Sequence, residues 1–347
     1  MNEVFFGDCR DTMRALIAQG VKVQMCVTSP PYFGLRDYGH PGQIGLEATP
    51  SEFVAAMVEV FELVREMLAD DGVLWLNLGD SYANDAKWGG STGGKHVQAL
   101  HGDSGIGRGK KTTGMRPKNL LGIPWRVALA LQEDGWNLRQ DIIWHKPNPM
   151  PESVTDRCTK AHEYLFLLSK NERYYWNAEA MQERAPGSLP GNQTHKYATA
   201  YEEGGDKKHR TKAGLVDYAK RARSKRDSFK RENSKRAQVI PGQTAGTHRP
   251  GRDESEWDAA TRNRRSVWTV PTAPYRGAHF ATFPPALIEP CILAGSRSGD
   301  TVLDCFFGSG TTGEVAGNLG RQWIGCELNP DYARLQLART AQGGLAI

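Results

Sequence analysis

A short motif, Ser29-Pro30-Pro31-Tyr32, brings together side chains that could do chemistry. It follows an apolar run, so we expect it to lie where a strand ends. The two prolines fix the backbone and hold the carbonyl of Pro30 still, so this oxygen and the hydroxyl of Ser29 can both accept hydrogen bonds. Tyr32 adds an aromatic ring. The motif is a candidate catalytic site, although the same residues could simply end a strand above a buried tyrosine.

A glycine-rich stretch, "DCFFGSGTTG" at 304–313, stands between a predicted strand and a helix-like run. Gly308, Gly310 and Gly313 satisfy the pattern G-x-G-x-x-G, and Glu327 ends the next predicted strand 17 positions after Gly310. Glycines let the backbone approach a ligand, and a carboxylate accepts hydrogen bonds from paired hydroxyls. A nicotinamide dinucleotide site and a turn without any ligand both remain open. The missing Gly-Lys-Ser/Thr excludes a Walker-type phosphate loop.

Seven short runs rich in apolar and β-branched residues predict strands. Segments with helical periodicity lie between several of them; in 51–72 we expect Ser51 to cap a helix that ends at Gly72. This alternation favours a doubly wound, mostly parallel α/β sheet, in which ligands bind at the carboxyl ends of strands. Both motifs stand at such ends. The predicted strands are residues 4–7, 22–29, 72–79, 140–147, 163–169, 301–307 and 323–328.

Two long interruptions break the alternation of strands and helices. One is glycine-rich and covers residues 84–116. The other is basic: between His195 and Arg265 there are 19 Lys and Arg against 10 Asp and Glu, whereas the rest of the chain carries 25 against 29. Residues 220–236 hold many of these charges and few large apolar side chains. This segment is therefore either a solvated loop or a region that contacts nucleic-acid phosphates.

Composition limits the class of protein. The 347 residues, 39% of them hydrophobic, can bury a sizeable core, and no run approaches the roughly 20 apolar residues of a membrane span. The sequence does not begin with a secretory signal pattern. Six cysteines occur without Cys-x-x-Cys spacing, which argues against a structural zinc and fits a reducing cytoplasm. We therefore expect a cytoplasmic protein that holds no metal and contacts no membrane.

The combination of three segments resembles the amino-methyltransferases of DNA, which move a methyl group from S-adenosylmethionine to the exocyclic nitrogen of cytosine or adenine. The segments are "TSPPY", "DCFFGSGTT" and "HFATFPPALIEPCI". Their order, with the catalytic motif first and the cofactor loop near the C-terminus, is similar to the permuted group called beta. The resemblance implies a circularly permuted, seven-stranded, Rossmann-like methyltransferase sheet with an inserted basic target-recognition region. It covers residues 4–37, 72–80, 140–168 and 279–330.

The resemblance also implies a division of the chain into three parts. Residues 1–186 are expected to form the catalytic part, 187–265 the DNA-binding insertion, and 266–347 the cofactor-binding part of the methyltransferase domain. The glycine-rich loop 84–116 is expected to become ordered on DNA. Double-stranded DNA is the expected partner, and a cognate restriction endonuclease is a further candidate.

The resemblance assigns the cofactor, S-adenosyl-L-methionine, to residues at several strand ends. Glu327 is expected to hold the ribose hydroxyls, Asp8 to meet the adenine amino group, and the hydroxyl of Thr282 to lie near the methionine carboxylate. The residues expected to line the methionine side all belong to the glycine-rich turn. They are Asp304, Phe306, Gly308, Ser309, Gly310 and Thr311.

For the catalytic motif, the resemblance implies that a nucleobase amine is the nucleophile. Such an amine is a poor nucleophile because its lone pair is delocalised into the ring. Hydrogen-bond acceptors on Ser29 and Pro30 would favour its pyramidal form. Pro31 keeps the motif rigid, and Tyr32 can stack on a base swung out of the duplex. We assign no general base, because water can take the amine proton. His145, Lys146 and His162 are expected near the edge of the site, where structural roles are equally open.

Ser29 at the first motif position favours N4 of cytosine, with N6 of adenine as the alternative. Methylation at C5 of cytosine needs a nucleophilic cysteine; Cys291 follows Pro290, but it lies in an apolar run without a Glu-Asn-Val partner, so we expect a core cysteine. A nicotinamide-dependent oxidoreductase, a catalytically inactive DNA-binding protein and an RNA substrate are further alternatives.

Overall fold

The computed structural model describes residues 2–35, 40, 42–83, 114–149, 151–184, 261–272 and 283–341. The chain divides into two compact units, Met1–Met181 with Arg264–Ile347, and Gln182–Asn263. In the second unit the described residues form an antiparallel pair, β6 (Gln182–Arg184) and β7 (Thr261–Asn263). Most of the predicted insertion 187–265 and of the predicted loop 84–116 lies outside the described residues, as does Thr282.

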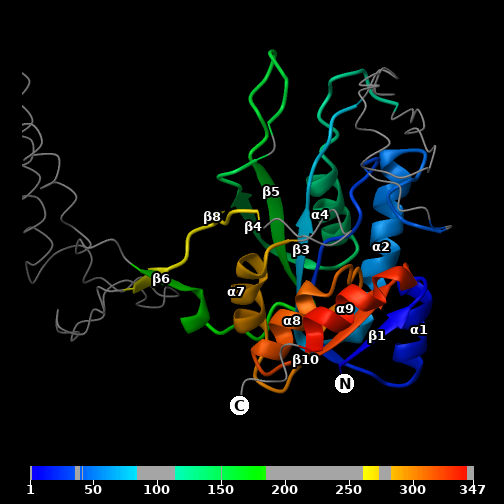
Figure 1. Ribbon diagram of the computed structural model, residues 1–347, viewed down its shortest axis with the longest axis vertical. Coiled ribbons are helices and arrows are strands. Elements are labelled where there is room, and N and C mark those ends of the chain that lie inside the picture. The colour runs from blue at the N-terminus through cyan, green and yellow to red at the C-terminus, as the bar shows by residue number, and fades with distance from the viewer. Residues whose placement is uncertain are drawn as a thin grey trace, which may run out of the picture. The chain divides into compact units, whose positions relative to one another are not determined.

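The first unit is built on a mixed sheet that has eight strands within the described ranges (Figure 1). Neighbouring strands are parallel from β1 to β3 and between β4 and β8, whereas β5 is antiparallel to both β3 and β4. The spatial order is β1 (Asn2–Phe6), β10 (Gln322–Glu327), β9 (Thr301–Asp304), β2 (Val23–Thr28), β3 (Leu68–Leu78), β5 (His162–Ser169), β4 (Asn137–His145) and β8 (Val267–Thr269).

Each of the seven predicted strands is present, and β8 adds an eighth at one edge. The prediction missed β8 because it has only three residues, "VWT", and Pro271 follows it closely. The doubly wound α/β class is therefore confirmed.

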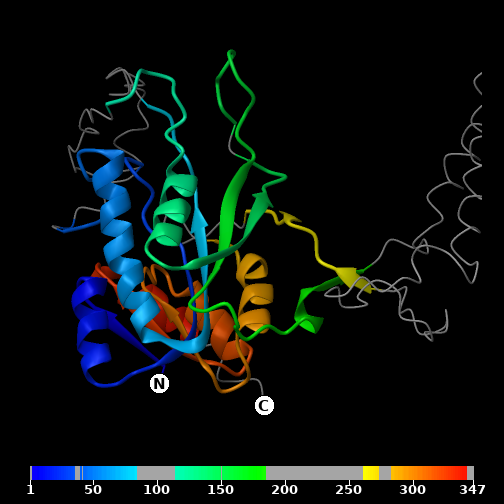
Figure 2. The ribbon, with the colours of Figure 1, turned by 180° about the vertical axis from the view of Figure 1, so that it is seen from behind.

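Helices cover both faces of this sheet (Figures 1 and 2). Side chains of α1 (Cys9–Ala18), α2 (Pro50–Met67) and α4 (Ile123–Glu133) share one core cluster with β3. Side chains of α7 (Pro285–Gly295) and α8 (Thr311–Asn318) share the other. Strand β3 shows why two cores form, because successive strand residues face opposite sides. Leu74, Leu76 and Leu78 enter the first cluster, and Val73 and Trp75 enter the second.

Helix α2 begins and ends earlier than predicted. Thr49 is the N-cap, not Ser51: its hydroxyl accepts from the amide of Glu52, whose side chain accepts from the amide of Thr49. Pro50 follows at the first helical position, where its fixed φ is favourable. The helix ends at Met67 instead of Gly72, because β3 begins at Leu68 and includes that glycine.

The chain after α8 returns through β10 to the short helices η4 (Pro330–Tyr332) and α9 (Ala333–Thr340). Helix η1 (Glu179–Met181) lies just before the boundary of the first unit. Cys291 is fully buried in α7, where its thiol donates to the carbonyl of Leu287, and burial raises the pKa of this thiol. The prediction of a core cysteine is therefore confirmed. No helix among the described residues is long and apolar enough to cross a membrane.

Candidate active site

A cavity lies at the carboxyl ends of neighbouring parallel strands of the sheet, including β1, β10, β9 and β2. The chain leaves β2 towards β3 on one side and leaves β9 towards β10 on the other, so the cavity stands at a topological switch point. Both sequence motifs reach it although Tyr32 and Asp304 are 272 positions apart in the sequence. Predicted site residues that line it are Asp8, Ser29, Pro30, Pro31, Tyr32, Asp304, Phe306, Gly308, Ser309, Thr311 and Glu327.

Two predicted cofactor residues do not appear in this lining. One of them is Gly310, the N-cap of α8, which has a φ of 87°. Gly308, which does line the cavity, has a φ of 52°. Both glycines therefore occupy the left-handed region that favours glycine. The backbone of the turn at 304–313 therefore depends on glycine at these two positions. The other residue, Thr282, lies outside the described part of the chain.

Asp304 ties the glycine-rich turn to the strand that carries the catalytic motif. One carboxylate oxygen accepts from the hydroxyl of Thr28 at 2.6 Å and from the amide of Phe306 at 3.1 Å, and the other accepts from the hydroxyl of Thr312 at 2.6 Å. Burial raises the pKa of Asp304 to about 6, and these hydrogen bonds oppose the shift. The carboxylate thus holds together the ends of β2 and β9 as well as lining the cavity.

Glu327 ends β10 as a mostly buried carboxylate. Its Oε2 accepts from the amide of Gly308 at 2.7 Å and its Oε1 from the amide of Asn329 at 2.8 Å. Burial raises its pKa to about 7. Each carboxylate oxygen can accept more than one hydrogen bond. Glu327 therefore keeps acceptor capacity towards the cavity, which fits paired ribose hydroxyls.

Helix α9 supports the turn through two side chains that the sequence reasoning missed. Gln336 donates to the carbonyl of Gly308 at 2.8 Å, and the guanidinium of Arg339 lies 2.5 Å from the hydroxyl of Ser309 and 2.7 Å from that of Thr311. No motif signalled either residue, since both belong to an ordinary helical pattern.

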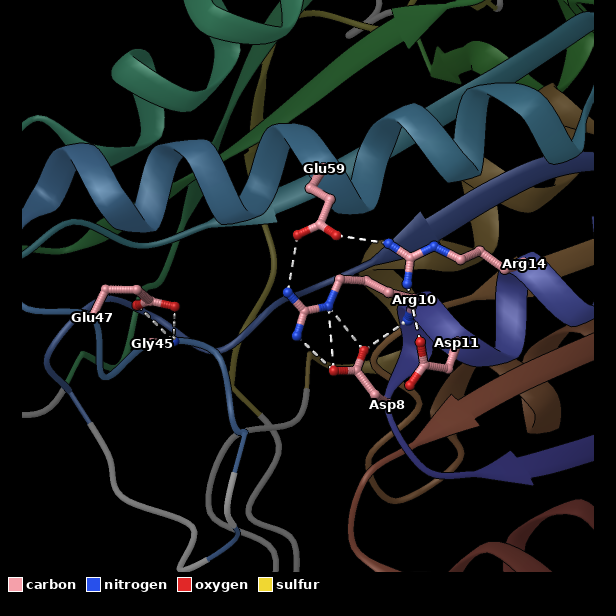
Figure 3. A network of polar contacts seen from close by, with 7 residues as sticks. All are labelled: Asp8, Arg10, Asp11, Arg14, Gly45, Glu47 and Glu59. Carbon is pink, nitrogen blue, oxygen red and sulfur yellow. Dashed lines mark hydrogen bonds and ion pairs between the residues drawn. The ribbon is translucent and has the colours of Figure 1, made fainter.

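Asp8 is fixed at the start of α1 by a network of charged side chains, drawn in Figure 3. Its carboxylate accepts from the backbone amide of Arg10 at 2.8 Å and forms an ion pair of 2.6 Å with the same residue. Glu59 of α2 bridges Arg10 and Arg14, whereas Glu47 binds the amide of Gly45 separately. The hydrogen bond from Arg10 lowers the pKa of Asp8. Asp8 is thus held as an ionised acceptor at the cavity.

The catalytic motif carries a second polar network. The hydroxyl of Ser29 lies 3.5 Å from that of Tyr32, which donates to Oε2 of Glu163 at 2.6 Å and lies 3.2 Å from Oδ1 of Asn77. The other oxygen of Glu163 pairs with Lys146. The sequence reasoning missed Asn77 and Glu163. Their signal is a polar residue within the apolar run 72–79 and a charged residue at the start of the run 163–169.

The two histidines predicted near the site do not line the cavity. His145 pairs with the hydroxyl of Thr269 at 3.1 Å. His162 packs edge-on against Tyr164, with ring centroids 5.4 Å apart, and burial lowers its pKa. Among the described residues, no cluster of three or more His, Cys, Asp or Glu side chains could hold a metal ion.

Comparison with solved structures supports the fold. The chain is similar to a protein of Thermus thermophilus described as a "Putative DNA Modification Methylase" complexed with S-adenosyl-L-methionine, with 19% identity, a TM-score of 0.51 and coverage of 100% and 98% of the two chains. It is also similar to the PvuII DNA methyltransferase, described as cytosine-N4-specific, with 16% identity, a TM-score of 0.54 and coverage of 99% and 86%.

Sequence comparison supports the family. The chain is 40% identical to the Type II methyltransferase M.SmaI of Serratia marcescens over 97% of this chain and 90% of the relative. It is 39% identical to the Type II methyltransferase M.Cfr9I of Citrobacter freundii over 97% and 86%. A sequence model of the family N6_N4_Mtase, described as DNA methylase, matches residues 23–338. The chain therefore belongs to the N6/N4 DNA methylase family and is a Type II DNA methyltransferase.

Proposed function

We propose that the enzyme methylates N4 of a cytosine that has been swung out of duplex DNA. The observation that carries this proposal is the cavity shared by the 29–32 motif and the glycine-rich turn. A methyl donor held by the turn would lie within reach of an amine held by the motif. Such proximity is the main requirement of a direct transfer.

S-adenosyl-L-methionine is the methyl donor, and its sulfonium supplies an electrophilic methyl group. We assign its ribose to Glu327, whose oxygens are acceptors, and its adenine amino group to Asp8, which is ionised and fixed by Arg10. The methionine side is assigned to the turn at 304–313, where left-handed glycines allow close approach of the backbone. We also assign the hydroxyl of Thr282, which lies outside the described residues, to the methionine carboxylate.

On the target side, the hydroxyl of Ser29 and the carbonyl of Pro30 accept hydrogen bonds from the two N–H groups of the amine. These bonds strengthen as positive charge develops on nitrogen, so they lower the barrier. Bound S-adenosyl-L-methionine would supply its methyl group to this nitrogen with the sulfur as the leaving group, and the amine would release one proton to water. The ring of Tyr32 stacks on the base and replaces part of the stacking lost in the duplex.

Serine at the first motif position supports cytosine, and N6 of adenine is the alternative on the same scaffold. The test is to incubate the enzyme with methyl-labelled S-adenosylmethionine and unmodified duplex DNA, digest the DNA and identify labelled nucleosides by mass spectrometry. We expect N4-methylcytosine. Label in N6-methyladenine instead would refute the choice of base and keep the site assignment, whereas absence of label from DNA would refute both.

We further propose that residues 187–265 read the DNA sequence and that the loop 84–116 becomes ordered on DNA. The basic composition of 220–236 supports phosphate contacts, because each neutralised phosphate releases counterions. Replacing Lys and Arg in 220–236 by Ala should weaken DNA binding and flatten its dependence on salt. An unchanged salt slope would assign these charges to solvation.

Two further experiments test this recognition proposal. Deletion of 195–265 should remove site choice, and DNA should protect the loop 84–116 from protease. An unchanged site preference or an unchanged cleavage rate would count against the respective part. The Type II names of the relatives also support a cognate restriction endonuclease as a partner in restriction-modification.

A further inference from the structure

A buried carboxylate stands directly behind the catalytic motif, and the proposed function gives it no role. Glu163, near the start of β5, keeps only 14% of its side chain exposed and does not line the cavity. We propose that Glu163 is a positioning residue that sets the direction of a hydrogen-bond chain from Ser29 through Tyr32, so that the oxygen of Ser29 faces the target amine as an acceptor. This inference rests on the proposed role of Ser29 and is independent of which base is methylated.

The chemistry of the site requires such a device. A serine hydroxyl both donates and accepts, and its proton rotates to the best acceptor nearby. To stabilise an amine that is losing its lone pair, Ser29 must accept, so its own proton must point elsewhere. The hydroxyl of Tyr32, 3.5 Å from that of Ser29, is placed to receive it. Tyr32 can do so only if its own proton is directed away from Ser29.

Glu163 directs that proton. Its Oε2 lies 2.6 Å from the hydroxyl of Tyr32, a length typical of a charge-assisted hydrogen bond. An ionised carboxylate can only accept, so Tyr32 must donate to it. The tyrosine oxygen then presents a lone pair, and not its proton, to Ser29. The sequence of donors is therefore Ser29 to Tyr32 to Glu163.

Asn77 offers Tyr32 a second acceptor, but a weaker one. Its amide nitrogen donates to the carbonyl of Tyr164 at 3.1 Å and to Glu163 at 3.3 Å, which leaves its oxygen facing Tyr32 at 3.2 Å. The tyrosine has one proton, so it can serve only one of the two acceptors. The shorter distance and the negative charge favour Glu163.

Two further features hold this arrangement in place. Lys146, 18% exposed, pairs with Oε1 of Glu163, so the charge is balanced. Oε2 accepts from Tyr32 at 2.6 Å and from Asn77 at 3.3 Å. Gly79, at the end of β3, lies against the ring of Tyr32, and a Cβ at this position would come within 2.4 Å of a ring carbon. Gly79 therefore fixes the position of the Tyr32 ring, and Glu163 fixes the position of its hydroxyl.

The test uses Glu163→Gln in two backgrounds. Because Lys146 attracts the amide oxygen, the amide nitrogen of the glutamine turns towards Tyr32 and donates. The tyrosine proton then loses its charged acceptor and keeps only the weaker acceptor Asn77 at 3.2 Å. With saturating DNA and S-adenosylmethionine, we expect the single-turnover methylation rate to fall about tenfold in the otherwise native enzyme. In the Ser29→Ala background we expect no further fall, because no serine proton remains to be directed.

Glu172→Gln is the matched control, since Glu172 is exposed and follows β5 at its other end. It should change the rate in neither background, and the affinity for S-adenosylmethionine should be unchanged in all variants. Tyr32→Phe, which deletes the link but leaves Glu163 intact, should lower the rate in the native background and cause no further fall in the Ser29→Ala background. This second pair does not alter Glu163, so it keeps the test valid if Glu163→Gln folds poorly.

The outcomes separate the inference from the proposed function. An equal fall caused by Glu163→Gln with and without Ser29 would assign Glu163 a purely structural role and overturn the inference alone. Full activity of Ser29→Ala would overturn the role of Ser29 and the inference with it. Methylation of adenine in place of cytosine would correct the proposed base and leave the expected pattern among the variants intact.

Discussion

The carboxylates Glu327 and Asp304, which line the cofactor side of the cavity, and Glu163, which stands behind its target side, differ in what holds them. On the cofactor side, Glu327 accepts hydrogen bonds from the backbone amides of Gly308 and Asn329, and Asp304 accepts from the amide of Phe306 besides two threonine hydroxyls. The amide donors belong to the main chain, so the turn geometry presents them whatever side chains surround it. Burial raises the pKa of both carboxyls, to about 7 for Glu327 and about 6 for Asp304.

On the target side, Glu163 receives its hydrogen bonds from the side chains of Tyr32, Asn77 and Lys146. The carboxylate and its three donors come from separate parts of the chain that the sheet brings together, since β3 and β4 both pair with β5. Substitutions that alter the main-chain conformation of the turn should therefore disable the cofactor side, whereas the target side should already be disabled by the loss of one side-chain donor or acceptor.

The largest effect is expected from Gly308→Val. Gly308 has a φ of 52°, where a side chain costs about 1–2 kcal/mol and a branched one is worse. The change would also displace the amide that binds Glu327. We expect binding of S-adenosylmethionine to be lost in isothermal titration calorimetry. Gly317→Ala, a helical position whose nearest neighbour would lie 4.0 Å away, is the control and should bind normally. Normal binding by Gly308→Val would contradict the cofactor assignment.

The raised pKa of Glu327 predicts a pH dependence of cofactor affinity. Ribose hydroxyls donate, so they favour the ionised carboxylate. Below pH 7 the affinity for S-adenosylmethionine should fall by about tenfold per unit, and above pH 7 it should level off. Calorimetric titration from about pH 5.5 to about 8.5 measures this, and Glu327→Gln should flatten the curve. A cofactor affinity that does not change with pH in the native enzyme would contradict the assignment of the ribose to Glu327.

Glu327 also makes the stability of the protein depend on pH, but in the direction opposite to that of cofactor affinity. The folded state raises the pKa of Glu327 from 4.5 to about 7, so between these values the folded state binds more protons than the unfolded state. The free energy of unfolding without cofactor should therefore decrease as pH rises through this window, by up to about 3 kcal/mol. Thermal melts across the window measure it, and Glu327→Gln should remove this part of the loss. A melting temperature that rises with pH in the native enzyme but not in this variant would contradict the shift.

A smaller effect is expected on the target side from Gly79→Ala. The added Cβ would meet the ring of Tyr32 at 2.4 Å, so the ring must move away from Glu163. We expect methylation to slow by about tenfold, the loss of one hydrogen bond, with unchanged cofactor affinity. Single-turnover rates and calorimetry on the same preparation test both statements. A loss of cofactor affinity would show that the two sides are not separable.

The smallest effect concerns Asp8, which an ion pair holds at the cofactor side. Arg10→Gln removes this ion pair, which is partly exposed, so we expect only a several-fold loss of cofactor affinity. Arg14→Gln is the matched control, because Arg14 contacts Asp11 and Glu59 but not Asp8 (Figure 3). Calorimetric titration of both variants measures the difference. Equal losses of cofactor affinity in Arg10→Gln and Arg14→Gln would mean that the network stabilises helix α1 in general and does not act specifically on Asp8.

The sequence predicted the features that local patterns encode. The seven strands follow from apolar runs, and the 29–32 motif and the 304–313 turn follow from proline and glycine at fixed spacing, which restrict the backbone locally. Family and fold class are confirmed for this reason. The roles of the individual site residues and the limits of the three predicted parts stay predictions.

Features that depend on tertiary contacts were not predicted. Asn77 and Glu163 meet Tyr32 only because β2, β3 and β5 are neighbours, and strand order is not written in any single segment. The start of α2 is a different case, because a local pattern encodes it: Thr49 and Glu52 form a capping box, and Thr49 lies two positions before the predicted cap Ser51.

If the cavity has two separable sides, one experiment should distinguish them. It measures cofactor affinity and the single-turnover methylation rate at saturating cofactor for Ser29→Ala and Glu327→Gln. We expect Ser29→Ala to keep its affinity and lose about 10²-fold or more in rate, and Glu327→Gln to lose affinity and keep most of its rate. If both variants lose affinity and rate together, the division into a cofactor side and a target side is wrong.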